Sequence, residues 1–409
     1  MTVNASDLTA YAHFTKRLYI DKNGVENVAN HAHPLWDMVD HSTEDTWEGD
    51  GNAGWSVAWG RNQAVGANYT TVSGNIDNNK GDRFNFDTRT FVYGFARLTG
   101  EVIKATRSNV GSIEKAVKDT NNQTIQTIKD RLALWLYGDG SGVIGRRSSL
   151  NTNTITLASA DDAKNFQKGQ YLQFSATQTG GSIKTGQCQV TKVTYGRTSS
   201  TITVDDISLI SGHANDDYIY NASDYDAVPT GLGGWIPTSD PSASDSFFGV
   251  NRSSDNLRLA GHRLDGTGYA SVKEVAQDLA NGMGRLSASR GEKAGMVHPT
   301  VFGELEKQLE TKAVRDPSNK ATFGYRFIEQ TSTCGDIRWY PDPDCPTHRM
   351  WILDPSDIFI LSLGRAPHVM DEDGMTLRKV SGADTWQTEW RFMGEFGVRN
   401  PVKHGVATL

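Results

Sequence analysis

The fold of this chain is decided by the stretch 113–137, which reads IEKAVKDTNNQTIQTIKDRLALWLY. Its apolar residues recur at intervals of three and four, the period of one buried helical face: Ile113, Val117, Ile125, Ile128, Leu132 and Trp135 or Leu136. Ser112 can cap the start, and Gly138 follows where a helix end favours a residue with positive φ. At ~1.5 Å per residue the helix is about 37 Å long. The pattern predicts a strut rather than a packing helix of a compact enzyme.

The segment before the helix predicts a thin β-ribbon. Trp55, Val57 and Trp59 alternate with small and polar residues, and Phe84 and Phe86 alternate on a returning limb. Residues 74–82 form a turn-rich tip between the limbs. Because a two-stranded hairpin is marginal on its own, it needs another surface to lie against. In a monomeric enzyme that surface belongs to the same chain, and in an assembly it can belong to the next subunit.

Residues 1–47 predict an arm rather than an independent domain. Two short helical faces occur, one of Leu8, Tyr11, Phe14 and Leu18, the other of Leu35, Met38 and Val39. They contain too few apolar residues for a core. We expect the arm to pack on the rest of the chain or on a neighbouring copy.

The chain after the helix changes composition at about residue 150. Residues 150–226 are rich in Thr, Ser and Gly, with β runs at 155–157, 171–174, 188–193, 201–204 and 218–220. Five or six strands at this spacing predict a small β-barrel. It interrupts the chain like a cassette inserted into a host domain.

The remaining residues mix helices and strands. Ser271 and Glu274 form a capping-box pair for a helix through 286, and Pro299 opens another helix. Strands are expected at 294–297, 337–340, 349–353 and 359–363. Residues 386–398 alternate strictly, with aromatic residues on one parity, which predicts a long half-buried antiparallel strand ending at Pro401. Its aromatic face is expected to pack against the 113–137 helix.

Bulk composition excludes several classes. The chain has 409 residues, 41 Lys plus Arg and 48 Asp plus Glu, and a net charge of -7. This balance argues against a surface that coats nucleic acid. The three cysteines, Cys188, Cys334 and Cys345, include no Cys-x-x-Cys and are expected to be reduced thiols of an intracellular protein. No signal-like start or membrane-length apolar run occurs, so a secreted or membrane protein is not expected.

The candidate sites favour ordinary structural interpretations. His31, His33 and His41 lack metal-ligand spacing, and the acidic runs 77–82 and 371–374 lack the oxygen pattern of a calcium loop. The glycines of 138–142 follow a helix, whereas a phosphate loop precedes one. Acidic pairs for glycoside hydrolysis need a cleft between them, and Glu44, Asp45, Glu48 and Asp50 are only neighbours in a polar linker. We predict no catalytic, cofactor-binding or metal-binding residues.

The order of these elements resembles the major capsid protein of tailed bacteriophages, which has the Hong Kong phage-type coat fold. Four short segments resemble that family locally: VAWGRNQ at 57–63, RLTGEVIKA at 97–105, LYGDGSG at 136–142 and MVHP at 296–299. The resemblance extends over nearly the whole chain, and the order of the segments carries it.

The resemblance implies an α+β chain with the Hong Kong phage-type capsid fold. Its parts would be an N-terminal arm (1–47), an extended loop (48–98), a peripheral domain (99–149 with 371–409), an inserted β-barrel (150–228) and an axial domain (229–370). The implied function is the shell subunit of an icosahedral head, assembled from hexamers and pentamers in the host cytoplasm. It would enclose double-stranded DNA without sequence-specific binding. A separate scaffolding protein and a portal are implied as partners, and a decoration protein is left open.

The family also raises one crosslinking chemistry. Some members join subunits through an isopeptide bond between an extended-loop lysine and a neighbour's asparagine. Lys80 lies at the ribbon tip and Asn400 near the end of the peripheral domain. Most members do not crosslink, and no matching glutamate aligns here, so no crosslink is expected.

Two alternatives remain open. An encapsulin-type nanocompartment shares the fold and loads protein cargo. The inserted barrel and the Gly-Asp-Gly helix ending favour the phage protein over it. A β-rich carbohydrate-active enzyme, suggested by 10 Trp and the acidic pairs, predicts a monomer or trimer with a tryptophan-lined cleft.

Overall fold

The computed structural model describes residues 33–42, 53–60, 64–74, 81–86, 89–101, 110–286, 291–309, 327–363 and 366–409. These residues belong to one compact unit, His33–Leu409. Leu8, Tyr11, Phe14 and Leu18 of the predicted arm lie outside the described residues.

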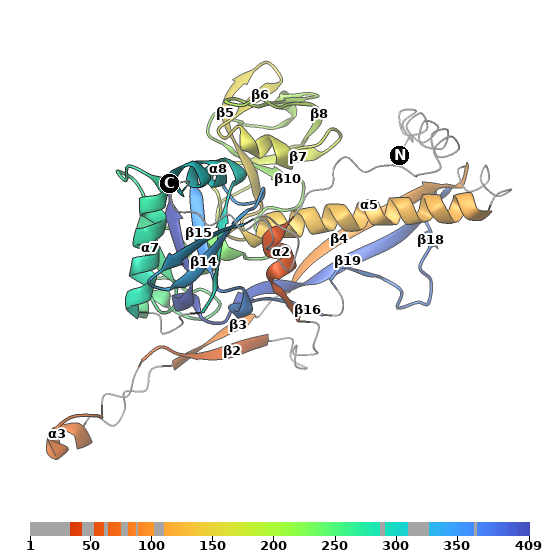
Figure 1. Ribbon diagram of the computed structural model, residues 1–409. Coiled ribbons are helices and arrows are strands. Elements are labelled where there is room, and N and C mark those ends of the chain that lie inside the picture. Colours follow the sequence, from red (N-terminus) through yellow and green to blue (C-terminus); the bar gives the residue numbers. More distant parts are fainter. Residues whose placement is uncertain are drawn as a thin grey trace. The chain divides into compact units, whose positions relative to one another are not determined.

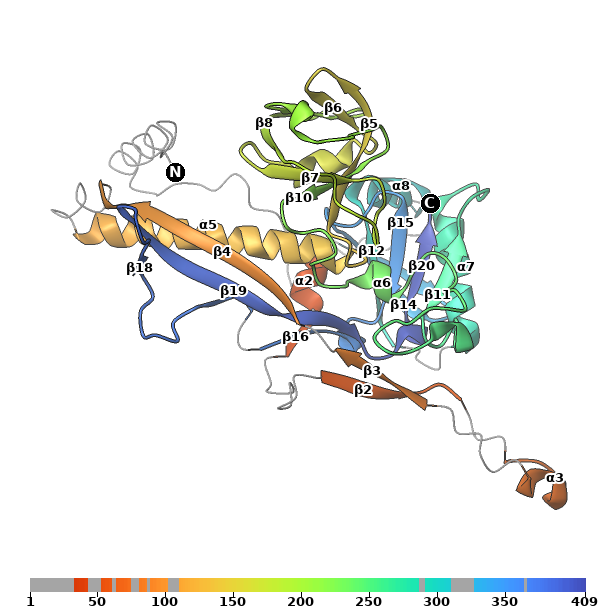
Figure 2. The same cartoon turned by 180° about the vertical axis from the view of Figure 1, so that it is seen from behind.

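The predicted long helix is present as α5 (Val110–Leu136) and lies alongside two long strands (Figures 1 and 2). The strands are β4 (Thr90–Thr99) and β19 (Thr385–Val398), paired antiparallel from Thr90↔Gly394 to Thr385↔Thr99. Gly94 allows the close approach of strand and helix, because a Cβ there would lie 2.7 Å from Ile128 and 2.8 Å from Thr124. The prediction that the closing strand packs on the helix is confirmed.

Two details of the helix prediction are wrong. The helix begins at Val110, so Ser112 lies inside its first turn and not at its cap. Gly138 does not take positive φ, which falls instead at Gly140 (φ 92°) and Gly142 (φ 78°). The helix closes with a tight turn in which the Gly138 amide donates to the Trp135 carbonyl at 2.8 Å.

The sheet around β19 also receives the described end of the arm. Its order is β1-β16-β19-β17, with β4 and β18 pairing β19 in addition. β1 (Asp40–Ser42) runs parallel to β16 (Ile358–Ser362), after the short helix α2 (Pro34–Met38). Short β17 (His368–Val369) and β18 (Arg378–Lys379) complete it. Leu35 and Val39 are buried, so this part of the arm packs on its own chain.

The ribbon is present as β2 (Ala53–Ala58) and β3 (Gly81–Phe86), with Trp55 opposite Phe84. It is shorter than the predicted long hairpin, because residues 69–73 of the ascending limb form helix α3 (Tyr69–Ser73). Asn68 caps this helix by accepting a hydrogen bond from the Thr71 amide at 3.2 Å. The part of the ribbon around Trp55, which we call the ribbon base, packs against its own chain. The Trp55 ring stacks on the Trp235 ring, with 5.4 Å between the ring centroids.

The predicted barrel is closed and has six strands, in the order β10-β5-β6-β9-β8-β7. Five match the prediction: β6 (Thr154–Leu157), β7 (Tyr171–Ser175), β8 (Cys188–Thr194), β9 (Thr201–Val204) and β10 (Tyr218–Asn221). The sixth, β5 (Val143–Asn151), starts before residue 150 and was missed. Its run Gly-Arg-Arg-Ser-Ser has no apolar residues at alternate positions, so the sequence pattern does not indicate a strand there.

The second large sheet has the order β11-β20-β15-β12-β14-β13. The predicted strands are β12 (Lys293–Val297), β14 (Gly335–Pro341) and β15 (Arg349–Leu353), and the unpredicted ones are β11 (His262–Asp265), β13 (Ile328–Ser332) and β20 (Gly405–Thr408). Helices α7 (Val272–Leu286) and α8 (Pro299–Leu309) share a core with it. The Glu274 amide donates to Ser271 Oγ at 3.3 Å, as the capping box predicts. The described helices include none long and apolar enough to cross a membrane.

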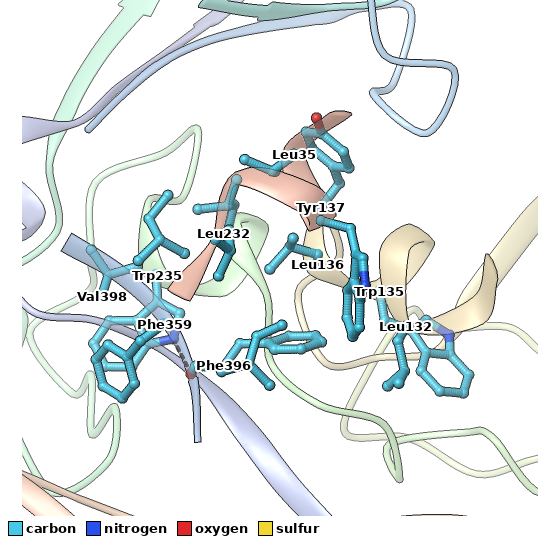
Figure 3. Packing of buried hydrophobic residues seen from close by; sticks show 14 of the residues in the cluster. Leu35, Leu132, Trp135, Leu136, Tyr137, Leu232, Trp235, Phe359, Phe396 and Val398 are labelled. Carbon is cyan, nitrogen blue, oxygen red and sulfur yellow. Dashed lines mark hydrogen bonds between the residues drawn. The ribbon is translucent and has the colours of Figure 1, made fainter. Parts of the chain in front are cut away.

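The main core forms where the C-terminal end of α5 meets β16, β19 and the short helix α6 (Leu232–Trp235). Figure 3 shows Leu132, Trp135 and Leu136 of α5 with Phe396 of β19, and the hydrogen bond from Trp235 to β19. That bond joins Trp235 Nε1 to the Phe396 carbonyl at 2.9 Å. Trp235 is fully buried and contacts Phe84, Phe247 and Phe248 besides Trp55. The core therefore joins the strut, the ribbon base and the segment that follows the barrel.

Candidate functional site

A buried polar cluster joins the described end of the arm to the rest of the chain. His33 Nε2 lies 2.8 Å from Asp130 Oδ1 on α5, and His33 Nδ1 lies 2.5 Å from Asp344 Oδ2. Asp344 belongs to the loop that follows β14. The His33 side chain is 1% exposed. We call His33, Asp130, Asp344, Asp342 and Tyr137 the polar clasp.

Asp342 is the second anchor of the polar clasp. Its Oδ2 accepts hydrogen bonds from the Tyr137 hydroxyl at 2.7 Å and the Leu35 amide at 3.2 Å. Burial and, to a smaller extent, the neighbouring Asp344 raise the pKa of Asp342 to about 6. The two hydrogen bonds favour the ionised form. The clasp thus holds the start of helix α2 in two ways, through the side chain of His33 and through the backbone amide of Leu35.

The charge of His33 is set by its two carboxylates. Burial lowers the pKa of His33, but hydrogen bonds and charges from Asp130 and Asp344 outweigh burial and raise it to about 9. The charged ring donates from both nitrogens. The stabilisation this gives is full below the ordinary pKa of 6.5 and is lost as the pH rises through about 9.

We expect His33→Gln to lower the free energy of unfolding by about 2–3 kcal/mol at pH 6–7. The difference from wild type should shrink as the pH rises through about 9, because the wild-type ring then loses its proton. Chemical unfolding followed by circular dichroism at several pH values measures it. His41→Gln is the matched control, since His41 is exposed and its Nε2 pairs with the Trp36 carbonyl. A difference that stays constant between pH 6 and 10 would contradict the assignment.

Sequence reasoning missed this cluster. His33 was predicted to be an ordinary loop histidine, but it is buried and paired, and its partners lie 97 and 311 positions away. No local spacing signals such contacts. Among the three histidines considered for a metal, His31 lies outside the described residues, and His33 and His41 share no partner. The described residues contain no group of three His, Cys, Asp or Glu placed to hold a metal ion.

The chemistry of the polar clasp is structural. Cys345 is the nearest thiol, but burial raises its pKa well above the ordinary value, so it is not a thiolate nucleophile. Its Sγ lies 3.7–3.8 Å from the backbone carbonyls of Met296, Pro346 and Arg349. Asp130 and Asp344 hold His33 between them. This arrangement joins the start of α2 to α5 and to the loop after β14.

A cavity of about 240 Å³ lies between the barrel, the end of α5 and the 344–349 loop. Burial raises the pKa of Asp162 in its wall to about 7. Asp161 and Asp162 are sequence neighbours, and Trp135 is the one tryptophan among the lining residues. The carboxylates of Asp139 and Asp344 also line the cavity, but with a single tryptophan it is not the tryptophan-lined cleft that the enzyme alternative predicts.

The outer face of β4 is an exposed aromatic row. Val92, Ala96 and Leu98 are buried toward α5, whereas the alternate residues Phe91, Tyr93 and Phe95 are 48%, 53% and 49% exposed. Phe91 and Tyr93 stack at 6.2 Å with an interplanar angle of 5°. We call Phe91, Tyr93 and Phe95 the aromatic row. Contiguous exposed apolar surface of this kind is a candidate surface for contact with another molecule.

Beside the aromatic row, β19 presents a mixed charged column. Its Met393, Arg391 and Glu389 lie directly opposite Phe91, Tyr93 and Phe95, so both columns share one face of the sheet. Arg378 pairs with Glu389 at 2.6 Å, and Arg391 pairs with Glu372. The face thus combines an apolar stripe with a polar rim, as protein interfaces do.

A second exposed surface lies on the loop between β2 and β3. Val65 is 82% exposed and Tyr69 is 87% exposed, and α3 has no buried residue. Tyr69 therefore contributes little to the packing of the part of the chain that the structure describes. We call Val65 and Tyr69 the loop surface.

The remaining sequence candidates are placed as follows. Glu44, Asp45, Glu48, Asp50 and Lys80 lie outside the described residues. Asp82, at the end of the acidic tip, accepts a hydrogen bond from Trp59 Nε1 at 2.6 Å. The 371–374 run forms a turn, with the Gly374 amide donating to the Asp371 carbonyl at 2.7 Å. Asn400 precedes a 3₁₀ turn at Pro401–Lys403.

Comparisons with known proteins place the fold. No protein-family model matches the sequence, and no curated protein matches it in sequence. The chain is similar in structure to the capsid asymmetric unit of Cyanophage A-1(L), with a TM-score of 0.53 and 9% identity, covering 94% of this chain and 96% of that one. The chain therefore has the fold of that capsid protein over nearly its whole length.

Two further structural likenesses are weaker. One is to the capsid of a native GTA particle, with a TM-score of 0.43, 9% identity and coverage of 95% and 94%. The other is to the SrpI encapsulin complex of Synechococcus elongatus PCC 7942, with a TM-score of 0.45, 9% identity and coverage of 96% and 93%.

Proposed function

We propose that this chain is a major capsid protein, the structural subunit that self-assembles into the icosahedral head shell of a tailed phage. The observation that carries the proposal is the capsid fold over 94% of the chain. The polar clasp adds to it, because the buried ionisable groups there secure an attachment and supply no nucleophile. A shell subunit needs rigid parts and complementary outer surfaces rather than a reaction centre.

We assign the parts of the fold accordingly. The ribbon, α3 and nearly all of β4 belong to the extended loop (48–98), and α5 with β19 forms the core of the peripheral domain (99–149 with 371–409), on which β4 packs. Strands β11, β12, β13, β14 and β15 with α7 and α8 form the axial domain (229–370), and β20 from the 371–409 part of the chain pairs into their sheet. The barrel is the inserted domain, with its start moved from residue 150 to Val143, because β5 closes the barrel between β10 and β6.

The assembly contacts we propose use the two exposed surfaces. The loop surface of one copy would rest on the sheet face of a neighbour that carries the aromatic row. Such a contact is heterologous, since different patches meet, and heterologous contacts close into rings when the rotation permits. Hexamers and pentamers of the chain would form in this way. Burial of the aromatic rings supplies the driving force.

The remaining partners follow from the same proposal. A separate scaffolding protein and a portal would act during head assembly in the host cytoplasm, and the mature location would be the virion. The net charge of -7 suits an inner wall that does not bind packaged double-stranded DNA tightly, because a protein with few phosphate contacts releases few counterions.

Electron microscopy of the purified full chain tests the proposal. We expect closed shells or rings of the chain after expression, alone or with a scaffolding protein. A monodisperse monomer or small oligomer under all assembly conditions, with hydrolase activity toward polysaccharides, would contradict it.

An encapsulin-type shell is the second candidate, and the inserted barrel favours the phage protein over it. The contents of isolated particles separate the two. Nuclease-protected double-stranded DNA supports a phage head, and a co-purified protein cargo supports a nanocompartment.

A further inference from the structure

The cavity between the barrel and the rest of the chain is lined by basic side chains from three separate segments. Lys164 comes from a 3₁₀ turn of the barrel, His298 precedes α8, and Arg349 begins β15. The positive charges of Lys164 and Arg349 both oppose the rise in the pKa of Cys345, and Lys164 also lowers the pKa of His298. Charges act in this way only over short distances, so the three side chains gather around one space.

Arg349 has a buried hydrogen-bond donor that is not used. It shares one face of β15 with Trp351 and Leu353, which belong to the main core, so its side chain lies on the side of the sheet where the cavity is. Its Nε is buried and has no hydrogen-bond partner in the part of the chain that the structure describes. Burial lowers the pKa of Arg349, and the charge of Asp139 opposes this only in part. A bound anion would offset the cost of burying this guanidinium.

His298 supplies a second donor. The Thr300 amide donates to His298 Nδ1 at 3.3 Å, and Thr300 Oγ1 lies 3.0 Å from the same nitrogen. Because Nδ1 accepts a hydrogen bond, the neutral ring carries its proton on Nε2. Both hydrogen bonds of this side chain to other described residues are made by Nδ1. The Nε2 proton is therefore available to an acceptor in the cavity.

The acidic side chains of the same cavity are engaged, partly protonated or exposed. Asp344 pairs with His33 at 2.5 Å, and Asp139 accepts hydrogen bonds from its own loop and from the barrel. Burial raises the pKa of Asp162 to about 7, so much of it is protonated near neutral pH, and Asp161 is exposed. The groups that remain unused in the cavity are hydrogen-bond donors, and they call for an acceptor.

We propose that this cavity binds an oxyanion, a phosphate or carboxylate group, held by Lys164, His298 and Arg349. The terminal nitrogens of Arg349 donate to two of its oxygens, Lys164 adds a positive charge, and His298 Nε2 donates a third hydrogen bond. A cavity of about 240 Å³ is smaller than the sites of drug-sized ligands, at about 300–1,000 Å³. The occupant is therefore inorganic phosphate, a small organic acid or a small phosphate ester.

The bound anion would join the barrel to the rest of the chain. Lys164 belongs to the barrel, whereas His298 and Arg349 belong to the 229–370 part of the chain. One anion held by both parts stabilises their contact by as much as it binds to that arrangement alone. The site lies within a single chain, so it does not depend on shell assembly, and its test does not require shells.

Calorimetric titration of the full-length subunit with inorganic phosphate tests the site, at pH 7 and at constant ionic strength set with sodium chloride. We expect saturable binding of one phosphate per chain. Arg349→Met and Lys164→Met keep most of the side-chain length and remove the charge. Each should raise the dissociation constant by about tenfold or more, because a hydrogen bond to a charged group is lost. Acetate in place of phosphate shows whether the site takes carboxylates as well.

Lys168→Met is the matched control, because Lys168 is exposed on the same barrel and does not line the cavity. It should keep the wild-type dissociation constant. Phosphate stabilises any protein through a general salt effect, so in thermal unfolding its midpoint rise must be larger for wild type than for Arg349→Met. Absence of saturable binding of both anions would overturn the site, as would an unchanged dissociation constant in either cavity variant. If Arg349→Met does not fold, Lys164→Met alone decides.

Discussion

We expect Trp235→Ala to lower the free energy of unfolding by about 3–5 kcal/mol, the largest single effect among these predictions. Trp235 is fully buried and packs against Trp55, Phe84 and Phe248 at ring distances of 5.1–5.4 Å. Removing the indole leaves a cavity where the ribbon base meets α6 and β19. It also leaves the Phe396 carbonyl without its hydrogen bond from Trp235 Nε1.

Chemical unfolding of the unassembled subunit, followed by circular dichroism, measures this loss. Trp235→Phe separates the two contributions, because it keeps most of the ring and loses only the N–H, and about 1–2 kcal/mol is expected. Trp59→Ala is the matched control. Trp59 is only partly buried, and its Nε1 pairs with Asp82 near the exposed end of the ribbon. If Trp59→Ala and Trp235→Ala lowered the free energy of unfolding equally, the prediction that Trp235 contributes more to stability than Trp59 would be wrong.

The second large effect is on assembly rather than folding. Tyr93→Lys, in the aromatic row, and Tyr69→Ala, on the loop surface, should each leave the free energy of unfolding within about 0.5 kcal/mol of wild type. Both side chains are more than half exposed. If each is a central contact worth about 2 kcal/mol, the subunit concentration needed for shell formation rises by about 30-fold or more.

Light scattering against subunit concentration, with microscopy of the products, measures this shift. The control is Tyr195→Ala on the barrel, which is 67% exposed and lies on neither surface. It should assemble as wild type. Normal shells from both Tyr93→Lys and Tyr69→Ala would refute the proposed contact, whereas an effect of only one would mean that the two surfaces meet different partners.

Several elements were predictable because their signal is local. The three-and-four spacing of α5, the alternation of β19 and the short regular strands of the barrel each reflect one face buried along a continuous segment. Terminal details were not predictable. Ser112 resembles a cap, but two further residues precede it in the helix, and Gly140 rather than Gly138 carries the first positive φ. Small differences in the packing of the helix termini decide at which residue a helix begins and ends.

Other elements left no local signal. β5 has a polar sequence, and its buried Arg147 is satisfied by hydrogen bonds to Asn215 and His213 in the segment before the neighbouring strand β10. β20 is four residues long and exists because β15 and β11 pair with it on either side. α3 occupies a segment that was expected to continue a strand. In each case long-range pairing or local capping outweighed the intrinsic preference of the residues.

By itself, the sequence determined the strut, the ribbon base, the barrel and the order in which they follow, because these depend on periodic burial within single segments. Only the tertiary structure decided which polar groups meet. The pairing of His33 with Asp130 and Asp344, and of Glu395 with Thr90 and Thr230, joins residues that are up to 311 positions apart. The cost of burying a charge depends on what surrounds it, and no segment of the chain contains its own surroundings.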